Sequence, residues 1–173
     1  MTQPIPFRLR FLQGMTSVLQ GITPANGFEH DLSAAVFRGR LTFGESDPTP
    51  LVSIIEPPLM PPSGVGPLGA GAHKEPWDLI VQGFVYDDNA NPTDPAHMLL
   101  AEVKIALAAE CQKLQGTPNA GNATIFGVPR KRIVSFDSEI GFVRPSDDIS
   151  SKAYFWLPLH IVVVEDWGNP YNV

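Results

Sequence analysis

The stretch AYFWLPLHIVVV, residues 153–164, carries the strongest fold signal in the sequence. Side chains alternate between two faces along a β-strand, and one face here is wholly apolar: Ala153, Phe155, Leu157, Leu159, Ile161 and Val163. The other face is hardly polar either: Tyr154, Trp156, Pro158, His160, Val162 and Val164. A strand with one face in water alternates more cleanly. Either helices cover both sides of this strand, or another chain covers one. Two helices barely suffice for both faces, so we favour another chain, with Tyr154 and Trp156 as candidate interface residues. Because proline cannot donate to a ladder, Pro158 predicts a bulge or a sheet edge.

Two further segments are predicted to be helices. Residues 6–20 repeat apolar side chains every three or four positions, and Gly21 is a suitable stop. Residues 95–115 follow Asp94, a good N-cap, and end at Gly116. The apolar stripe of the second helix is expected to comprise Leu99, Val103, Ala106, Leu107 and Leu114.

Four more strands are expected, at residues 29–40, 51–56, 77–87 and 133–143, with Val134, Phe136, Ile140 and Phe142 on one face of the last. The order is α-β-β-β-α-β-β, and the first three strands are expected to be linked as hairpins. This order predicts an α+β fold. We expect one domain over residues 1–173, with a mostly antiparallel sheet of about five strands and both helices packed on one face.

Two long loops interrupt this pattern, at residues 57–76 and 116–132. The first is rich in proline and glycine, and Met60, Val65 and Leu68 give it apolar side chains that would contact a partner. Far shorter connections join most hairpin strands. We therefore expect this loop to be an arm that orders only against a neighbour, which is either an adjacent subunit or the tube or connector ring; the alternative is a solvent-exposed linker. The second loop ends in a basic cluster, Arg130, Lys131 and Arg132.

Composition narrows the class of protein. The net charge of -6 argues against a general nucleic-acid binder. The single cysteine, Cys111, allows neither an internal disulfide nor a multi-cysteine zinc site. No apolar run approaches the roughly 20 residues that cross a bilayer, so no membrane contact is expected. Charged residues make up only 17% of the chain, which indicates either a large core or much surface covered by other subunits.

No reactive constellation is evident, and we expect neither an enzyme nor a cofactor or metal site. Cys111 lies in an alanine-rich helix, where a structural thiol is the simpler interpretation. Asp94 and His97 are explained by a helix cap and a surface histidine. Arg38, Arg40 and the 130–132 cluster are best explained as a solvated face or as contacts to an acidic partner surface.

An ordered series of short segments resembles the tail terminator (tail completion) proteins of long-tailed bacteriophages. The series comprises ITPANGF at 22–28, VFRGR at 36–40, PLVSIIE at 50–56, QGFV at 82–85, NPTDPAH at 91–97, SSKAYFWL at 150–157 and VED at 164–166. It spans nearly the whole chain.

The resemblance implies a subunit of a homo-hexameric ring in the virion, assembled in the host cytoplasm. Such a ring caps the tail tube protein, stops tube polymerisation and docks the head-to-tail connector or neck protein. Double-stranded DNA passes through the lumen without specific recognition, and an acidic lumen would repel its phosphates. The family has no catalytic residues. Three alternatives remain: another neck or head-closure ring protein, a small hydrolase using Cys111 and His97, and a DNA-binding accessory protein.

Overall fold

A long two-stranded ribbon is the centre of the fold. The computed structural model describes residues 4–44, 46–57, 71–115, 123–147 and 150–171. Strands β3 (Ala72–Val85) and β8 (Ala153–Asp166) pair antiparallel along all 14 residues, from Ala72 opposite Asp166 to Val85 opposite Ala153. The sheet order is β1-β2-β3-β8-β6, and β7 also pairs with β8. The remaining strands of the sheet are β1 (Val36–Arg38), β2 (Leu51–Ile55), β6 (Ile133–Ser138) and β7 (Phe142–Arg144).

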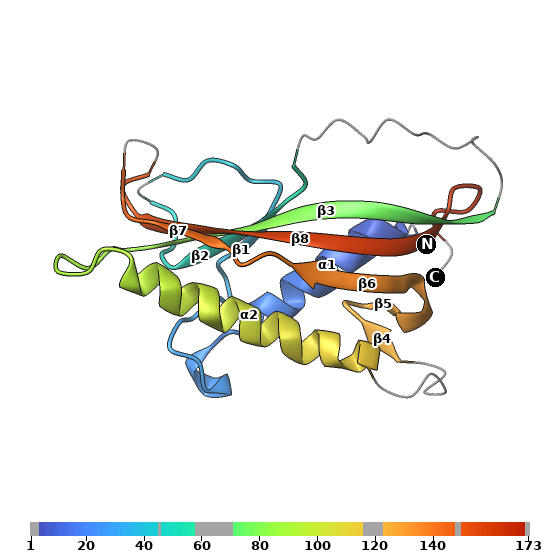
Figure 1. Cartoon of the computed structure of the whole chain (residues 1–173), viewed down its shortest axis with the longest axis horizontal. Coiled ribbons are helices and arrows are strands. Elements are labelled where there is room, and N and C mark those ends of the chain that lie inside the picture. The colour runs from blue at the N-terminus through green and yellow to red at the C-terminus, as the bar shows by residue number, and fades with distance from the viewer. Residues whose placement is uncertain (1–3, 45, 58–70, 116–122, 148–149, 172–173) are drawn as a thin grey trace.

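Both helices, α1 (Phe7–Gln20) and α2 (Asp94–Gln115), cover the same face of this sheet (Figure 1). The side chains of β8 that point toward them are at most 1% exposed: Ala153, Phe155, Leu157, Leu159, Ile161 and Val163. Helix α1 adds Phe7, Phe11, Met15 and Leu19, spaced four residues apart and fully buried. The predicted α+β class and the position of both helices are therefore confirmed.

The predicted strand at 29–40 is wrong for most of its length, because only Val36–Arg38 forms β1. The preceding residues are attached to α2 instead. The carboxylate of Glu102, which is 8% exposed, accepts hydrogen bonds from the backbone N–H groups of Glu29 and His30, at 2.6 and 3.3 Å. In addition, β1 pairs parallel to β2, so these two strands do not form the expected hairpin.

The predicted strand at 133–143 is two strands, separated by a turn at Glu139–Gly141. The apolar face expected for this strand is not buried. The side chains of Val134, Ile140 and Phe142 are 48%, 87% and 60% exposed. The turn explains Pro158, which lies in the central strand β8. Its carbonyl accepts the Glu139 backbone N–H at 3.1 Å. Because both backbone groups of a residue face the same neighbouring strand, the missing N–H of Pro158 points to the gap between β6 and β7. The sheet has a local edge there, although β8 is not an edge strand.

Both long loops are shorter than predicted. Residues 72–76 already belong to β3. Residues 124–132 hold a hairpin of β4 (Thr124–Ile125) and β5 (Val128–Pro129), followed by a 3-10 turn at Arg130–Arg132. Phe126 at the hairpin turn is 1% exposed and packs its ring 5.0 Å from that of Phe11. This hairpin therefore adds to the core beneath α1.

Candidate interaction surface

The sheet face opposite the helices is covered over only part of its length by the described residues. Above β2 it is buried: Leu51, Ser53 and Ile55 are 0%, 0% and 6% exposed. Residues 39–44 and 46–50, which we call the covering segment, cross this end of the sheet (Figure 1). The remainder, which we call the uncovered sheet region, comprises half-buried or exposed side chains: Pro76, Asp78, Ile80, Phe142, Trp156, Pro158, His160, Val162 and Val164.

Arg40 holds the covering segment in place. Its guanidinium donates to the Asp47 carboxylate at 2.7 Å and lies 5.0 and 4.8 Å from the ring centroids of Phe37 and Phe43. Its carbonyl accepts the Ser53 hydroxyl at 2.8 Å. Arg40 therefore has an internal role, although 41% of its side chain is exposed, and Arg38 is exposed as well. Contact of both arginines with a partner stays a prediction.

Two aromatic side chains of the uncovered sheet region, Trp156 and Phe142, are exposed. Trp156 is 39% exposed and lies opposite Phe142 of β7, which is 60% exposed. Tyr154, two residues earlier on the same face, is only 2% exposed and donates its hydroxyl to Asp147 at 2.9 Å. Of the two predicted interface residues in β8, Trp156 is accessible, while Tyr154 belongs to the subunit's own packing.

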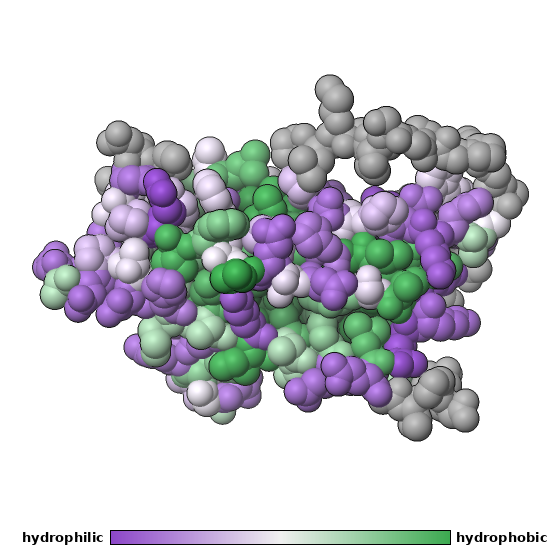
Figure 2. Space-filling model, viewed as in Figure 1, coloured by the Kyte–Doolittle hydropathy of each residue, from purple (hydrophilic) through white to green (hydrophobic). Residues whose placement is uncertain are grey.

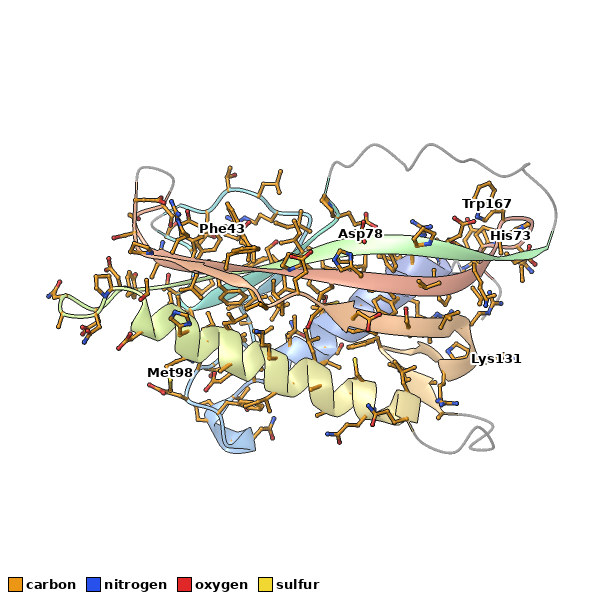
Figure 3. The ribbon with its side chains drawn as sticks, in the orientation of Figure 1. Phe43, His73, Asp78, Met98, Lys131 and Trp167 are labelled. Carbon is orange, nitrogen blue, oxygen red and sulfur yellow. The ribbon has the colours of Figure 1, made fainter. Side chains whose placement is uncertain are left out.

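A histidine joins three elements on this face. His160 Nδ1 lies 2.8 Å from Asp78 of β3, and Nε2 lies 3.1 Å from Glu139 in the β6–β7 turn. Asp137 of β6 is its cross-strand neighbour. Hydrogen bonds to Asp78 and Glu139 raise the pKa of His160 above its ordinary value, because they favour the imidazolium. Figure 3 shows Asp78 on β3.

Helix α2 presents a second unusual surface, which the sequence analysis missed. Between residues 95 and 112, its exposed side chains carry no formal charge: His97, Met98, Ala101, Ile105, Ala108, Ala109 and Gln112. Met98 and Ile105 are 50% and 59% exposed. A surface helix ordinarily has a charged outer face. The outer face of α2, defined as these residues other than His97, is instead apolar or neutral. In Figure 2, green and pale green surface along this helix is interrupted by purple groups.

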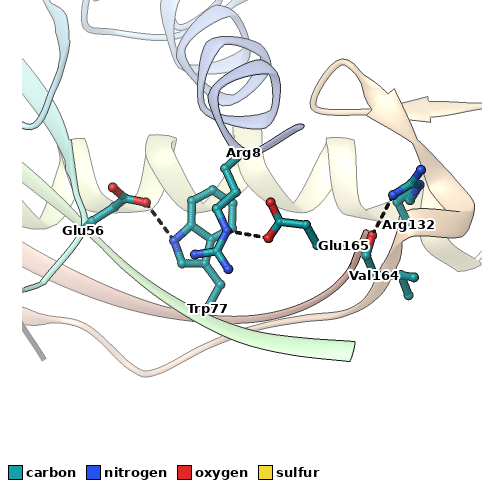
Figure 4. A network of polar contacts seen from close by, with 6 residues as sticks. All are labelled: Arg8, Glu56, Trp77, Arg132, Val164 and Glu165. Atoms are coloured by element: carbon teal, nitrogen blue, oxygen red, sulfur yellow. Dashed lines mark hydrogen bonds and ion pairs between the residues drawn. The ribbon is translucent and has the colours of Figure 1, made fainter. Parts of the chain in front are cut away.

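The second basic cluster is largely structural. Arg130 donates to the carbonyls of Lys113 and Leu114 at the C-terminus of α2, where a cation is favourable. Arg132 donates to the Val164 carbonyl at 3.2 Å (Figure 4). Only Lys131 of the three is exposed. Met60, Val65 and Leu68, the predicted contacts of the first loop, lie outside the described residues, as does most of that loop.

A polar network anchors α1 and the distal part of the β3–β8 ribbon, and the sequence analysis did not foresee it (Figure 4). Arg8 of α1 pairs with Glu165 of β8 at 2.8 Å and lies 5.2 Å from the Trp77 ring centroid. The Trp77 indole donates to Glu56 at 3.0 Å. The charges at this site are therefore used within the subunit.

Cys111 and His97 do not form a catalytic pair. Fourteen positions on one helix separate them by roughly 21 Å. Burial, with a smaller contribution from Glu110, raises the pKa of the Cys111 thiol to about 11, opposite to the lowered pKa of a nucleophilic cysteine. The described residues contain no cluster of three His, Cys, Asp or Glu residues with metal-binding geometry. Within the same residues, no helix is long and apolar enough to span a membrane.

The sequence matches no protein-family model. A search of curated proteins also gives no match.

Proposed function

We propose that this chain is a ring-forming structural subunit of a bacteriophage tail, with the role of a tail terminator. The observation that carries the proposal is the placement of two surfaces that expose large apolar side chains. The uncovered sheet region lies on one side of the molecule, and the outer face of α2 lies on the other, beyond the helix layer (Figure 1).

This placement suits a head-to-tail contact. A heterologous interface joins two different surfaces of neighbouring copies, and it gives a ring when the rotation closes. The exposed Trp156 and Phe142 on one side, and Met98 and Ile105 on the other, provide apolar side chains for such a contact. Large exposed apolar side chains that gather on one surface are typical of interaction sites.

The tail role rests on the resemblance of the sequence and on the charge of the chain. A ring of chains that each carry a net charge of -6 would let DNA pass without retaining it. Its two rims would then bind the tail tube and the head-to-tail connector.

The test is a length-control assay on tail tubes. Tube protein is polymerised from tail tips with and without the purified chain, and the products are measured by negative-stain imaging. We expect tubes of defined length with the chain at the end distal to the tip. Unchanged tube growth and no binding to tube ends would contradict the proposal. Binding to connectors alone would assign the chain to a different neck ring.

A further inference from the structure

A pocket with aromatic walls lies where the covering segment meets β8. Leu41 and Phe43 of that segment, Phe84 of β3 and Trp156 of β8 line it. The rings form a continuous row, with centroids 5.3 Å apart for Phe43 and Phe84, 5.9 Å for Phe84 and Tyr154, and 5.5 Å for Tyr154 and Trp156. Arg40 fixes Phe43 through the contacts described above, so one wall of the pocket is preformed. Figure 3 shows Phe43 above this end of the sheet.

One cation, Lys152, lines this pocket without a hydrogen bond or a close ion pair to its ammonium among the described residues. Lys152 is 7% exposed, yet its ammonium makes no hydrogen bond or ion pair with any described residue. Two described groups act on this ammonium: the Tyr86 ring, whose centroid lies 5.9 Å from Nζ, and the Asp47 carboxylate, which interacts with it electrostatically from beyond ion-pair distance. Asp47 is already hydrogen-bonded to Arg40. Buried charges are ordinarily paired. The side chain of Lys152 is therefore held at a position where an incoming anion would complete its interactions.

The remaining lining adds hydrogen-bonding groups. Gln82 of β3 and the hydroxyl residues Thr42 and Ser151 lie around the same pocket. Binding sites commonly combine apolar walls with a few polar groups that fix orientation. This pocket would accommodate a flat or branched apolar group that carries a carboxylate next to it.

We infer that this pocket binds a protein segment of an assembly partner that presents a carboxylate beside an aromatic or aliphatic side chain, with Lys152 receiving the carboxylate. The inference rests on the proposed function only in taking the partner to be a protein. Nucleic acid fits the pocket less well. One ammonium on a chain of net charge -6 provides few phosphate contacts, and phosphate contacts dominate affinity for DNA.

The experiment uses the full chain labelled with 5-fluorotryptophan and 19F NMR at pH 7. The chain has three tryptophans, so three signals are expected, and Trp156→Phe identifies the one from Trp156. Two peptides are titrated, acetyl-Asp-Phe-amide and acetyl-Asn-Phe-amide, which differ only in the carboxylate. We expect the Trp156 signal to shift and the Asp peptide to bind roughly tenfold more tightly, as for one charge-assisted hydrogen bond.

Two variants assign the preference. Lys152→Met keeps the apolar stem and should abolish the difference between the peptides, while circular dichroism shows a native fold. Lys131→Met removes an exposed lysine outside the pocket and should leave the difference intact. Equal binding of both peptides, an unchanged preference in Lys152→Met, or stronger binding of a ten-residue thymidine oligonucleotide would overturn the inference.

If ring assembly already fills the pocket, the peptides will not bind, and a second measurement is needed. In that case Lys152→Met should raise the concentration at which the ring dissociates, by roughly tenfold on the same reasoning. No change in either assay would also overturn the inference. Peptide binding does not depend on tube capping, so a failure here is distinguishable from a failure of the proposed function.

Discussion

His160 shows at the level of one residue how charge joins separate strands. Its two ring nitrogens face Asp78 and Glu139 at 2.8 and 3.1 Å. A neutral imidazole has a single N–H, so only the imidazolium donates to both carboxylates. The pKa of His160 is raised above 6.5 in the folded chain. Its stabilising effect is therefore complete below pH 6.5 and is lost as the pH rises through the raised pKa.

We predict that the unfolding free energy falls by about 0.5 kcal/mol more in wild type than in His160→Gln between pH 6 and pH 8.5, a small effect because the pair is half exposed. Urea denaturation of both proteins at each pH measures it. Parallel pH profiles would show that the two hydrogen bonds do not contribute to stability.

Side chains that act through the tertiary structure were the least predictable from sequence. Glu102 lies in α2, where a charged residue is usually solvated, yet it is buried and binds the backbone of Glu29 and His30. Arg40, Arg130 and Arg132 were predicted to face solvent or an acidic partner surface, and their internal contacts were not predicted. Each also binds a backbone carbonyl, a carboxylate or an aromatic ring within the subunit. Sequence position alone does not reveal such partners, because they come from distant segments.

The turn of the β4–β5 hairpin packs closely against helix α1. Phe126 and Gly127 at this turn have φ angles of 49° and 73°, as in the tight turns that suit the twist of a hairpin. Gly14 of α1 packs directly on this turn, and a Cβ atom there would overlap with the Phe126 carbonyl group.

We predict that Gly14→Ala destabilises the chain by about 2–3 kcal/mol. Alanine gains about 1 kcal/mol of helix propensity, but the overlap is with backbone, which cannot rotate away, and overpacking costs up to about 3 kcal/mol or more. Urea denaturation compares it with Gly44→Ala, whose Cβ would meet only Asp47 Oδ2 at 4.0 Å. A Gly14→Ala variant as stable as Gly44→Ala would contradict this packing.

Elements with a strong period were predicted well, and elements defined by turns were not. Both helices and β2, β3 and β8 follow from apolar spacing to within a few residues, except that β3 begins five residues earlier. The β6–β7 break was missed because Val134, Phe136, Ile140 and Phe142 alternate as in one continuous strand. The β4–β5 hairpin was missed because Phe-Gly is an uncommon turn sequence, whereas Asn-Gly or Asp-Gly would have indicated it.

At the scale of the whole molecule, the covering of the sheet decides which side chains of its outer face are exposed. The sequence indicated two apolar faces on β8, and the structure places helices over one. The covering segment lies over part of the other, and no sequence pattern predicted this. Trp156 was therefore a correct candidate for exposure and Tyr154 was not. The sequence does contain a signal for the neutral outer face of α2. The helix positions outside the predicted apolar stripe carry fewer charged residues than a surface helix usually has.

We predict that Trp156→Asp blocks assembly while leaving the fold intact, whereas Phe155→Asp prevents folding. The two residues are adjacent in β8 and point to opposite faces. Trp156 is 39% exposed, while Phe155 is fully buried with its ring against Gly83. An unpaired carboxylate is strongly destabilising in a core. Circular dichroism and size-exclusion chromatography separate the two outcomes. Unfolding of both variants would show that Trp156 serves the subunit's own core.

The most direct measurement is the mass and shape of the purified chain, alone and on tail tubes. Native mass spectrometry and negative-stain imaging of wild type should give a closed ring at six times the chain mass of 18.8 kDa, either free or at the tube end. Trp156→Asp should remain a folded single chain in both settings. A wild-type protein that stays monomeric in solution and is absent from tube ends would contradict the proposed ring.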